Sequence, residues 1–566
     1  MARKYSSLDE VPIHIKEKLS RYFSNVGGTT FVIHGLPSEL TGGALARYSR
    51  APTGMQLTVV NEFLDENGNP LPEKGSELMD RVLNAFGDDS VGELEGVHTG
   101  VEDVSQLMTK HIEDRRIGGS PIEQSTRYVK YDVKNSQGKW RYLRPKDVIE
   151  SGLREEYEKA NDLAFEVYSE GIRRLTDHFK KELPRSKFQI DVDREGKKVK
   201  IFEDGLVGQE EVKAFNTAYN FTIRCAALDV GRCVLPSSTL THLGLYGNGR
   251  FFTNLLTHLK IDDLEESRQR ASELETELKK YIPTFIKRAD ESDKKNRENL
   301  QRVGERSRTI DSGMRKLVED YFEKIVPEDK KVTMVKRADY LDEVISASLF
   351  PYAKISMQQI LSEVQKMSYK TKIKILETYI GNREGRRDRT GRGFEAGYPL
   401  TFDLVGGFAE YRDLERHRML TQQRQLLGVS LGFLMPPEMA IVGLEKEVEE
   451  VVSKMEDLNG GLRRAGLDAA SQYATLFNHR IRFMLGMNLR EFQHLSELRT
   501  QLAGHFSYRA MVMEMAREVE KAFPWASKSY GFVNYSDPEN KISRYNEQAK
   551  IAGKSLKTGV DMSADL

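Results

Sequence analysis

The spacing of apolar and polar positions changes several times along the chain, and each change predicts a different element. Residues 186–202 alternate between apolar and polar on both sides of Arg-Glu-Gly, which is typical of a β-hairpin with a short glycine-containing loop. Residues 259–325 are mostly charged with a helical period and predict surface helices, divided at Pro283, that lead into a linker. Two further amphipathic helices are expected between about 460 and 522. The polar residues from 527 onward predict a loosely ordered tail.

Two blocks of this pattern occur twice in the chain. GVHTGVEDVSQLMTKHIEDRRI begins at Gly96 and GYPLTFDLVGGFAEYRDLERHRM begins at Gly397, an offset of 301 residues. YGNGRFFTNLLTHLK and LGMNLREFQHLSELR align Asn248 with Asn488, an offset of 240 residues. The first copy therefore carries about sixty extra residues, and the predicted hairpin with its preceding helix, near 145–205, is the expected insertion. We interpret the chain as a tandem duplication whose two modules have diverged.

The repeat and the charged linker divide the chain into five predicted parts. They are an N-terminal extension (1–30), a first module (31–290), a helical linker (291–330), a second module (331–526) and a polar tail (527–566). The length of 566 residues is enough for several compact units with cores of their own.

Composition limits the classes of partner. The chain has 86 Lys plus Arg and 86 Asp plus Glu, so a basic binding site must be local.

Cys225 and Cys233 are eight residues apart, which is neither a disulfide framework nor a metal-binding spacing and indicates a reducing compartment. The most apolar run, 426–443, is interrupted by Pro436 and Pro437, and the first residues contain no apolar stretch of signal-peptide length. These features predict a soluble, cytoplasmic protein that does not enter a membrane.

Three polar residues stand at alternate positions in the segment PIEQSTRYV. They are Glu123, Ser125 and Arg127. In an extended chain these side chains would share one face. Because that face carries a carboxylate, a hydroxyl and a guanidinium but no apolar group, the spacing predicts a site for a polar ligand.

The same segment ends a motif that is similar to a family signature. Flavin-dependent thymidylate synthases have Arg-His-Arg, seven further residues and then Ser, usually continued by x-Arg-Tyr. The first module has Arg-Arg-Ile from Arg115, followed by Ser125, Arg127 and Tyr128. The second module has the complete trio Arg416–Arg418 but places Leu, Gly and Val at the later positions. Each module therefore keeps one end of the signature and has lost the other.

A downstream block shows the same division. In the family it runs from an Arg before x-Val-Leu-Pro to Asn-x-Arg, then to an Asn or His, and finally to an Arg. The first module supplies Arg232, Asn248, Arg250 and Asn254, with Leu259 at the last position. The second module has Gln472 at the first position and then Asn488, Arg490, His494 and Arg499.

The resemblance implies an α+β fold, helix-rich overall, in which each module is a small antiparallel sheet with long helices. It implies an enzyme that uses FAD, reduced by NADPH, to transfer and reduce a one-carbon unit from methylenetetrahydrofolate to C5 of dUMP. The implied dUMP-binding residues are Glu123, Ser125, Arg127 and Arg232. The implied FAD-binding residues are Ser90, Asn248, Arg250, Asn254, Arg416, His417, Arg418, Asn488, Arg490 and His494. Arg499 would stabilise the charge that develops on the uracil ring.

The resemblance also implies a particular assembly. In the family, the active sites lie between the subunits of a homotetramer. A tandem chain needs only one good copy of each part if its halves face each other. We therefore expect the first module to bind the nucleotide phosphate and the second to bind the flavin, and two chains to form a homodimer that rebuilds the four-lobed assembly.

Other interpretations stay open. Each motif taken singly could be a solvated helix face, a helix cap or a surface ion pair. The chain could be a catalytically inactive relative that binds a nucleotide or nucleic acid, or an enzyme that modifies C5 of another pyrimidine nucleotide. The arginine- and glycine-rich residues 381–393 lack the Gly-Lys-Ser/Thr of a P-loop and predict a basic loop. No pair of His or Cys residues has metal-ligand spacing, so we expect no metal, and nucleic acid is the less favoured partner.

Overall fold

The computed structural model describes residues 5–49, 51–85, 89–385 and 388–558. The chain forms two compact units: unit 1 comprises Met1–Val104, Met108–Glu123 and Thr241–Glu305, and unit 2 comprises Ser105–Leu107, Gln124–Leu240 and Arg306–Leu566. Residues 124–240, which the repeat assigns to the first module, therefore belong to unit 2 together with the second module. The modules 31–290 and 331–526 remain a prediction about the repeat and do not coincide with the compact units.

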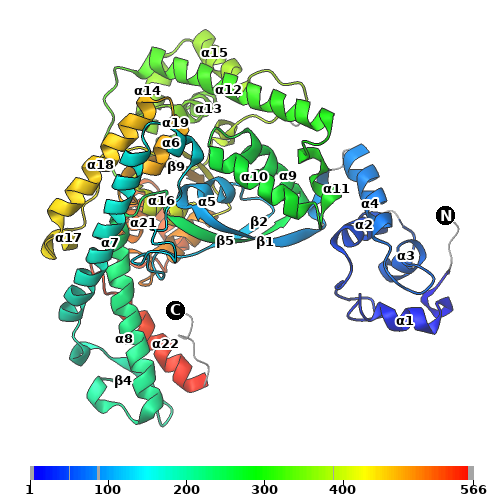
Figure 1. The fold of residues 1–566 in the computed structure, drawn as a ribbon, viewed down its shortest axis with the longest axis horizontal. Helices are drawn as coiled ribbons and strands as arrows, with labels where there is room; N and C mark the ends of the chain where they lie inside the picture. The colour runs from blue at the N-terminus through cyan, green and yellow to red at the C-terminus, as the bar shows by residue number, and fades with distance from the viewer. Residues whose placement is uncertain (1–4, 50, 86–88, 386–387, 559–566) are drawn as a thin grey trace. The chain divides into compact units, whose positions relative to one another are not determined.

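Unit 1 contains the N-terminal helices and the first sheet. The elements that lie wholly or mostly in it are α1 (Ile13–Leu19), α2 (Ser38–Tyr48), α3 (Met55–Glu62), α4 (Pro72–Met79), β1 (Gly96–Ser105), α5 (Gln106–Glu113), β2 (Gly119–Glu123), β5 (Leu240–Asn248), α9 (Gly249–Ile261), α10 (Glu265–Leu278) and α11 (Pro283–Ile286) (Figure 1). Pro283 is the first residue of α11, a position where the missing N–H has no helical partner to lose, so the predicted division at this proline is confirmed. Helix α1 buries Ile15 and Leu19 in one core with α2 and α3, so the predicted N-terminal extension is part of a folded core.

The first sheet has the strand order β1-β5-β2. Strand β2 runs antiparallel to β5, with Ser120 opposite Tyr246. Leu243 and Leu245 of β5 point into a core with Phe252 of α9, because alternate residues of a strand face the same side. The alternation that the sequence shows in 240–248 is therefore that of a strand with helices on one face.

Unit 2 contains most of the long helices and two further sheets. Its elements are α6 (Lys146–Glu150), α7 (Arg154–Glu182), β3 (Ile190–Arg194), β4 (Lys197–Ile201), α8 (Gly208–Gly231), α12 (Lys294–Phe322, which begins in unit 1), β6 (Val332–Met334), α13 (Tyr340–Leu349), α14 (Met357–Lys366), α15 (Tyr369–Ile380), β7 (Leu400–Gly407), α16 (Phe408–Leu414), β8 (Thr421–Arg424), α17 (Pro437–Ile441), α18 (Glu445–Arg464), α19 (Asp468–Ser471), β9 (Arg480–Met487), α20 (Leu489–Arg499), α21 (Phe506–Ala522) and α22 (Tyr545–Thr558). Helices α20 and α21 confirm the two amphipathic helices expected before residue 522. The helix-rich α+β fold with small antiparallel sheets is also confirmed.

The second sheet repeats the strand pairing of the first. Its order is β6-β7-β9-β8, and Thr421 of β8 lies opposite Gly486 of β9. The offsets of 301 and 240 residues carry Ser120 onto Thr421 and Tyr246 onto Gly486, so the same pair occurs in both sheets. The repeat found in the sequence is thus present as an equal register in the two sheets.

The predicted hairpin is confirmed. Strands β3 and β4 pair antiparallel, with Arg194 opposite Lys197. The two residues between them, Glu195 and Gly196, have φ angles of 55° and 80°, as the tight turns of two-residue hairpins require.

The expectation of a loosely ordered tail is wrong for the residues that the structure describes. Residues 545–558 form α22, which packs against α8 and β3 (Figure 1). Gln548, Ala549 and Ala552 are buried in this contact. The helix was not expected because it buries two alanines and a glutamine instead of large apolar side chains.

The two modules meet in unit 2 through a symmetric pair of backbone hydrogen bonds. The N–H of Ser237 donates to the carbonyl of Thr475 over 2.8 Å, and the N–H of Phe477 donates to the carbonyl of Leu235 over 2.9 Å. The offset of 240 residues exchanges the two bonds, because it carries Leu235 onto Thr475 and Ser237 onto Phe477. The same patch of each module therefore contacts the other, as at the two-fold axis of a symmetric dimer.

None of the helices in the described part of the chain combines the length and the hydropathy that a bilayer-spanning helix requires.

Candidate active site

The segment that carries Ser125 and Arg127 is a turn and not a strand. Strand β2 ends at Glu123, and the carbonyl of Ser125 accepts hydrogen bonds from the backbone N–H groups of Tyr128 and Val129. The hydroxyl of Ser125 accepts a further bond from the N–H of Arg127 over 3.2 Å. The predicted shared face of three alternating side chains is therefore wrong, because the hydroxyl closes a local turn as serine side chains often do.

Glu123 lies in unit 1 and has buried partners there. Its carboxylate accepts from the Thr109 hydroxyl over 3.0 Å and from the Lys110 ammonium over 3.3 Å. The same ammonium group also pairs with Glu113, and its side chain is fully buried. In this structure Glu123 balances a buried lysine, a contact that its alternation with Ser125 did not suggest.

Arg127 forms a bidentate ion pair with Asp229 inside unit 2. Its Nε and Nη2 atoms each lie 2.7 Å from an oxygen of Asp229, near the end of α8. Its Nη2 also donates to the carbonyl of Ala503, and its Nη1 lies 3.4 Å from the hydroxyl of Tyr508. Burial alone would lower the pKa of Arg127, but attraction to Asp229 outweighs it and raises that pKa well above its usual value. The guanidinium is therefore a fixed positive charge.

The buried hydroxyl of Thr126 joins the two modules. It accepts from Nη1 of Arg232, at the end of α8, over 3.3 Å and from Nη1 of Arg412, in α16, over 3.4 Å. Arg232 is 2% exposed, and its nearest charged partner is Asp413, whose Oδ2 lies 3.8 Å from Nη2. Asp413 also pairs with Arg416. Two guanidinium groups therefore share one neutral acceptor, and the carboxylate of Asp413 lies beside one of them.

The hydrogen bonds of Arg232 are incomplete. Its Nε and Nη2 atoms are buried and make no hydrogen bond to any residue that the structure describes. Burial lowers the pKa of Arg232 to about 10, although Asp229 and Asp413 oppose the shift. Unpaired buried donors are uncommon in folded proteins, and a bound ligand or water is one of the explanations for them.

His417, the middle residue of the Arg-His-Arg trio, links two other side chains. Its Nδ1 lies 2.8 Å from a carboxylate oxygen of Glu491, and its Nε2 accepts from Nε of Arg499 over 2.9 Å. Because the guanidinium can only donate, Nε2 must be unprotonated and the ring proton must be on Nδ1. Burial lowers the pKa of His417, and the neutral ring is the form that this pair of bonds requires.

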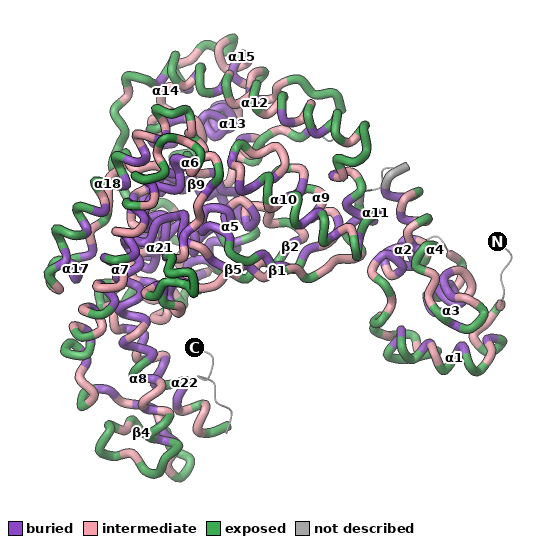
Figure 2. The backbone as a smooth tube through the Cα atoms, viewed as in Figure 1, coloured by how far each residue is buried: buried purple, intermediate pink, exposed green. Residues whose placement is uncertain are grey.

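Tyr508 connects the two groups of arginines. The guanidinium carbons of Arg127 and Arg499 lie 5.9 Å and 5.8 Å from the centre of its ring. Both distances allow a cation–π contact. Nearby, Nε2 of His505 donates to the carbonyl of Asp229 over 3.0 Å, and burial lowers the pKa of His505 to about 3. Helix α21, which carries Tyr508 and is capped by His505, lies in a largely buried part of unit 2 (Figure 2).

The structure therefore brings together residues from both modules. The predicted residues in this cluster are Ser125, Arg127, Arg232, Arg416, His417 and Arg499. The residues that the sequence reading missed are Thr126, Asp229, Arg412, Asp413, Glu491, His505 and Tyr508. Asp229 and Asp413 could have been found, since each stands three residues before an arginine of the motif on the same helix or turn.

The remaining flavin positions of the second module lie at the start of α20 and beside the trio. Asn488 caps α20, because its side chain accepts from the N–H of Glu491 over 3.0 Å. Arg418, Arg490 and His494 are exposed, and the ring of His494 lies 5.4 Å from that of His417. An exposed guanidinium at a helix N-terminus, as at Arg490, suits the phosphates of a dinucleotide, and the exposed Arg418 adds a second cation, so these residues fit FAD.

The flavin positions of the first module belong to unit 1. Asn248 caps α9 by accepting from the N–H of Phe251 over 2.8 Å, as its counterpart Asn488 does for α20. Arg250 pairs with Glu93, while Asn254 and Ser90 are exposed. These contacts are structural ones that caps and surface ion pairs make in many proteins, so the flavin role of the four residues remains a prediction.

The counterparts of the buried cluster have lost its charges. The offsets carry Thr126, Arg127, Asp229 and Arg232 onto Leu427, Gly428, Ala469 and Gln472. Gln472 contacts Leu427, the counterpart of Thr126, just as Arg232 contacts Thr126. Its side-chain oxygen accepts from the N–H of Leu427 over 3.2 Å. The two positions therefore stay in contact through a different pair of atoms, although the charge has been removed.

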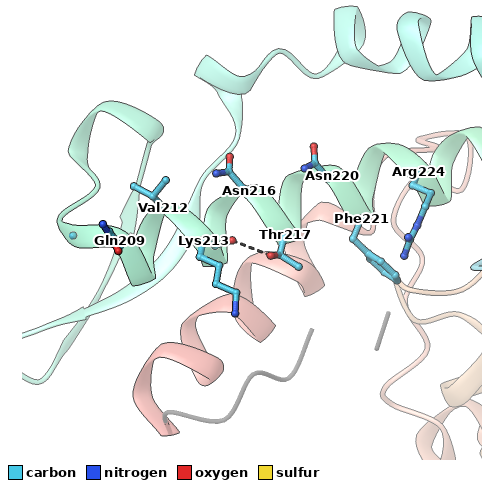
Figure 3. Close-up of a pocket in the computed structure, with 9 residues that line it drawn as sticks. Gln209, Val212, Lys213, Asn216, Thr217, Asn220, Phe221 and Arg224 are labelled. Carbon is cyan, nitrogen blue, oxygen red and sulfur yellow. Dashed lines mark hydrogen bonds between the residues drawn. The ribbon is translucent and has the colours of Figure 1, made fainter. Parts of the chain in front are cut away.

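A separate groove of about 820 Å³ runs along α8 (Figure 3). It is lined by nine residues of this helix, from Gly208 to Arg224, most of them polar. None of the predicted site residues is among them. The described residues also contain no cluster of three His, Cys, Asp or Glu side chains that could hold a metal ion.

Part of the basic loop predicted at 381–393 falls outside the described residues, at 386–387. In the described part, Nε of Arg383 donates to the carbonyl of Asp388 over 2.7 Å, and the Asp388 side chain accepts from the N–H of Glu384 over 2.8 Å. These local bonds close the loop on itself.

Comparison with known proteins shows where the chain belongs. It is 34% identical over 548 residues to the "UPF0159 protein" of Chlamydia muridarum, covering 94% of this chain and 97% of the relative, and 32% identical over 548 residues to that of Chlamydia pneumoniae, with the same coverage. A UMP/dUMP methylase from Streptomyces cacaoi covers 44% of this chain and 88% of its own, with 18% identity and a TM-score of 0.26. A flavin-dependent thymidylate synthase from Helicobacter pylori covers 43% of this chain and 90% of its own, with 17% identity and a TM-score of 0.22.

The sequence model of the "Thymidylate synthase complementing protein" family matches two separate stretches, residues 44–284 and 355–525. Each stretch contains one copy of the repeat. The chain therefore belongs to the flavin-dependent thymidylate synthase family, as a tandem of two diverged copies.

Proposed function

We propose that this chain is an FAD-dependent enzyme that reductively methylates dUMP at C5, with methylenetetrahydrofolate and NADPH as cosubstrates. The observation that carries the proposal is the buried guanidinium of Arg232, which has two nitrogen atoms without hydrogen-bond partners among the described residues and lies beside Thr126 and Arg127. A buried donor set of this kind suits the phosphate of a nucleotide, because guanidinium groups bind phosphate oxygens in pairs.

Each part of the cluster has a distinct proposed task. Arg232 and Arg127 would hold the phosphate, with Asp229 fixing the orientation of Arg127. Arg499 would face the uracil ring, where a fixed cation stabilises the negative charge that develops on the ring during attack by C5. Its Nε is occupied by His417, so its terminal nitrogen atoms are those that a carbonyl oxygen of the base would meet.

The flavin would lie against the second module. Arg416, Arg418, Asn488, Arg490 and His494 would bind it, and FAD when bound would supply the reducing equivalents of the reaction. The neutral ring of His417 lies between this surface and Arg499, so it orients the cation without adding a charge of its own.

One complete site per chain follows from the loss of charge at Gly428, Ala469 and Gln472 and of the hydroxyl at Leu427. We further propose that two chains form a homodimer with the four-lobed arrangement of the family, which sedimentation of the full chain would test. A dimer would contain two sites in place of four.

The decisive experiment uses the purified full chain. We expect it to be yellow, to lose flavin absorbance when NADPH is added, and to release tritium from dUMP labelled at C5. The variant Arg232→Ala should lose tritium release, whereas Arg173→Ala, which removes an exposed arginine of α7, should keep it.

Two outcomes would favour the other interpretations. A colourless chain that binds oligonucleotides in a salt-dependent way would indicate an inactive, nucleic-acid-binding relative. A yellow chain that is bleached by NADPH but releases no tritium from dUMP would indicate another pyrimidine nucleotide as substrate.

A further inference from the structure

The C-terminal segment after residue 525 lies outside both stretches that the family model matches, yet it folds onto the candidate site. Helix α22 packs against α8, the helix that carries Asp229 and leads directly into Arg232 (Figure 1). The segment before it, residues 532–544, contacts the turn between α20 and α21. That turn connects Arg499 with His505 and Tyr508.

A buried arginine anchors this segment. Arg509 of α21 is fully buried, and its Nη2 donates to the hydroxyl of Ser536 over 3.1 Å while its Nη1 lies 3.3 Å from the hydroxyl of Ser543. Its Nε donates to the carbonyl of Thr500 over 3.2 Å. The hydroxyl of Thr500 in turn accepts from the N–H of Asn534 over 3.0 Å. The C-terminal segment and the turn are therefore tied together at several points.

Arg544 extends these contacts to the nucleotide side of the site. It is 5% exposed, its Nη1 donates to the hydroxyl of Tyr128 over 3.1 Å, and its guanidinium carbon lies 5.3 Å from the centre of the Tyr128 ring. Its Nη2 donates to the carbonyl of Ala503. The same carbonyl accepts from Nη2 of Arg127 over 3.2 Å.

The charge of Arg544 is not balanced by a contacting carboxylate. Within the described residues, no Asp or Glu side chain forms an ion pair with it, although Asp229 accepts two bonds from Arg127 close by. Burying a guanidinium without a carboxylate is costly. A contact that served stability alone could be made by a neutral side chain at lower cost, so the charge at this position points to the anion that the site binds.

On these grounds we propose that the C-terminal segment is a built-in part of the nucleotide site and that Arg544 is its positioning residue. Arg544 holds the carbonyl of Ala503 where Arg127 meets it, and it also holds Tyr128, the residue that follows Arg127 in the chain, so that the cation of Arg127 faces the ligand in a fixed orientation. This inference rests on the proposed binding of dUMP, and it assigns a role to a part of the chain that the family match does not include.

A purely structural role for the segment is the competing explanation. Lys541 provides the matched control, because it belongs to the same segment and its side chain is also largely buried, but it packs on the ring of Phe506 at 3.8 Å and near Glu438. It makes no contact with Tyr128, Ala503 or Arg127 among the described contacts. If the segment only stabilised the fold, Arg544→Ala and Lys541→Ala would have the same effects.

The test measures two properties of the full-length chain. The first is the dissociation constant for dUMP by calorimetry, and the second is amide hydrogen exchange of residues 500–505. We expect Arg544→Ala to weaken dUMP binding about tenfold and to speed exchange in the turn. We expect Arg544→Lys to recover less than half of the loss, since an ammonium group cannot bond both partners in the plane of a fork.

Lys541→Ala should lower the melting temperature without changing either property. Should Arg544→Ala fail to fold, Tyr128→Phe removes the hydroxyl partner alone and should weaken dUMP binding by a factor of two to five with an unchanged melting temperature. Unchanged exchange and unchanged dUMP affinity in a folded Arg544→Ala chain would overturn the proposed role of Arg544. Absence of dUMP binding by the wild-type chain, with faster exchange of the turn in Arg544→Ala, would instead overturn the proposed substrate and leave the positioning role standing.

Discussion

Arg499 donates from its Nε to Nε2 of His417 over 2.9 Å, and this single contact fixes the protonation of the histidine. The imidazole must carry its one proton on Nδ1, where it donates to Glu491. The histidine of the Arg-His-Arg trio thus links a buried carboxylate to the cation proposed to face the substrate.

Glu491→Ala should release this link. Without its acceptor, the His417 ring can move its proton to Nε2, and it can then no longer accept from Arg499. We expect nitrogen chemical shifts of the imidazole to show the Nε2–H tautomer and tritium release to fall about tenfold, which corresponds to about 1.4 kcal/mol, near the worth of one hydrogen bond. Glu491→Gln keeps an acceptor and should retain most of the activity. Equal activity of wild type and Glu491→Ala would contradict the assigned role.

Arg127→Ala and Arg499→Ala should each abolish turnover, and mixing the two variant chains should not restore it. The reason is that both residues contact Tyr508 of the same chain, so one chain supplies both halves of a site. The measurement is tritium release after the two variants have been unfolded together and refolded. Recovery of about a quarter or more of wild-type activity would show that sites form between chains instead. The double variant, refolded with wild type, controls for the refolding yield.

Thr126→Val should destabilise the fold by about 1–3 kcal/mol, because two buried guanidinium groups lose their common acceptor. Urea unfolding followed by circular dichroism measures the loss. Thr222→Val is a matched control: Thr222 is equally buried, but its hydroxyl donates to the carbonyl of Ala218 within its own helix. That change should cost less, since the helix keeps its backbone bonds. A loss at Thr126 no larger than at Thr222 would argue against the shared contact.

The free energy of unfolding should fall as the solution is acidified below pH 6.5. Burial lowers the pKa of His505 from 6.5 to about 3, so below pH 6.5 the unfolded chain binds a proton that the folded chain does not. Stability is therefore fully present above pH 6.5 and is lost progressively toward pH 3, by about 1.4 kcal/mol per pH unit for this group. Urea titrations at pH 7 and pH 5 measure the slope. His505→Gln should have a shallower slope, and an unchanged slope would show that His505 is already protonated in the fold.

Much of the fold could be predicted from local pattern. The hairpin at 186–202 has a strict alternation and a turn with one glycine, and both features depend only on neighbouring residues. The equal register of the two sheets followed from constant offsets between the repeats. Helix α22 was missed because it buries alanine and glutamine against α8, a contact that the polar sequence of the tail does not announce.

The candidate site could be predicted only in part. Motif residues such as Arg127, Arg232 and Arg499 could be named because their order and spacing matched a family. Thr126 and Tyr508 could not be named, since threonine and tyrosine have many roles in proteins. The roles of these two residues depend on the packing of segments that are distant in the sequence. Arg544 carries no sequence signal at all, because its partners lie more than forty residues away. The alternation of Glu123 with Arg127 led to a wrong prediction of a shared face, because strand β2 ends at Glu123 and a turn closed by the Ser125 hydroxyl follows it.

The reciprocal backbone bonds at Ser237 and Phe477 have an evolutionary consequence. In an assembly of identical chains every substitution is present in all lobes, so one lobe cannot lose a binding residue that the others keep. Fusion of two lobes across such an axis removes that constraint. A binding residue can then be lost from one lobe without loss of function if the other lobe keeps its counterpart. Joined in this way, a symmetric ancestor can give rise to an asymmetric descendant through losses alone.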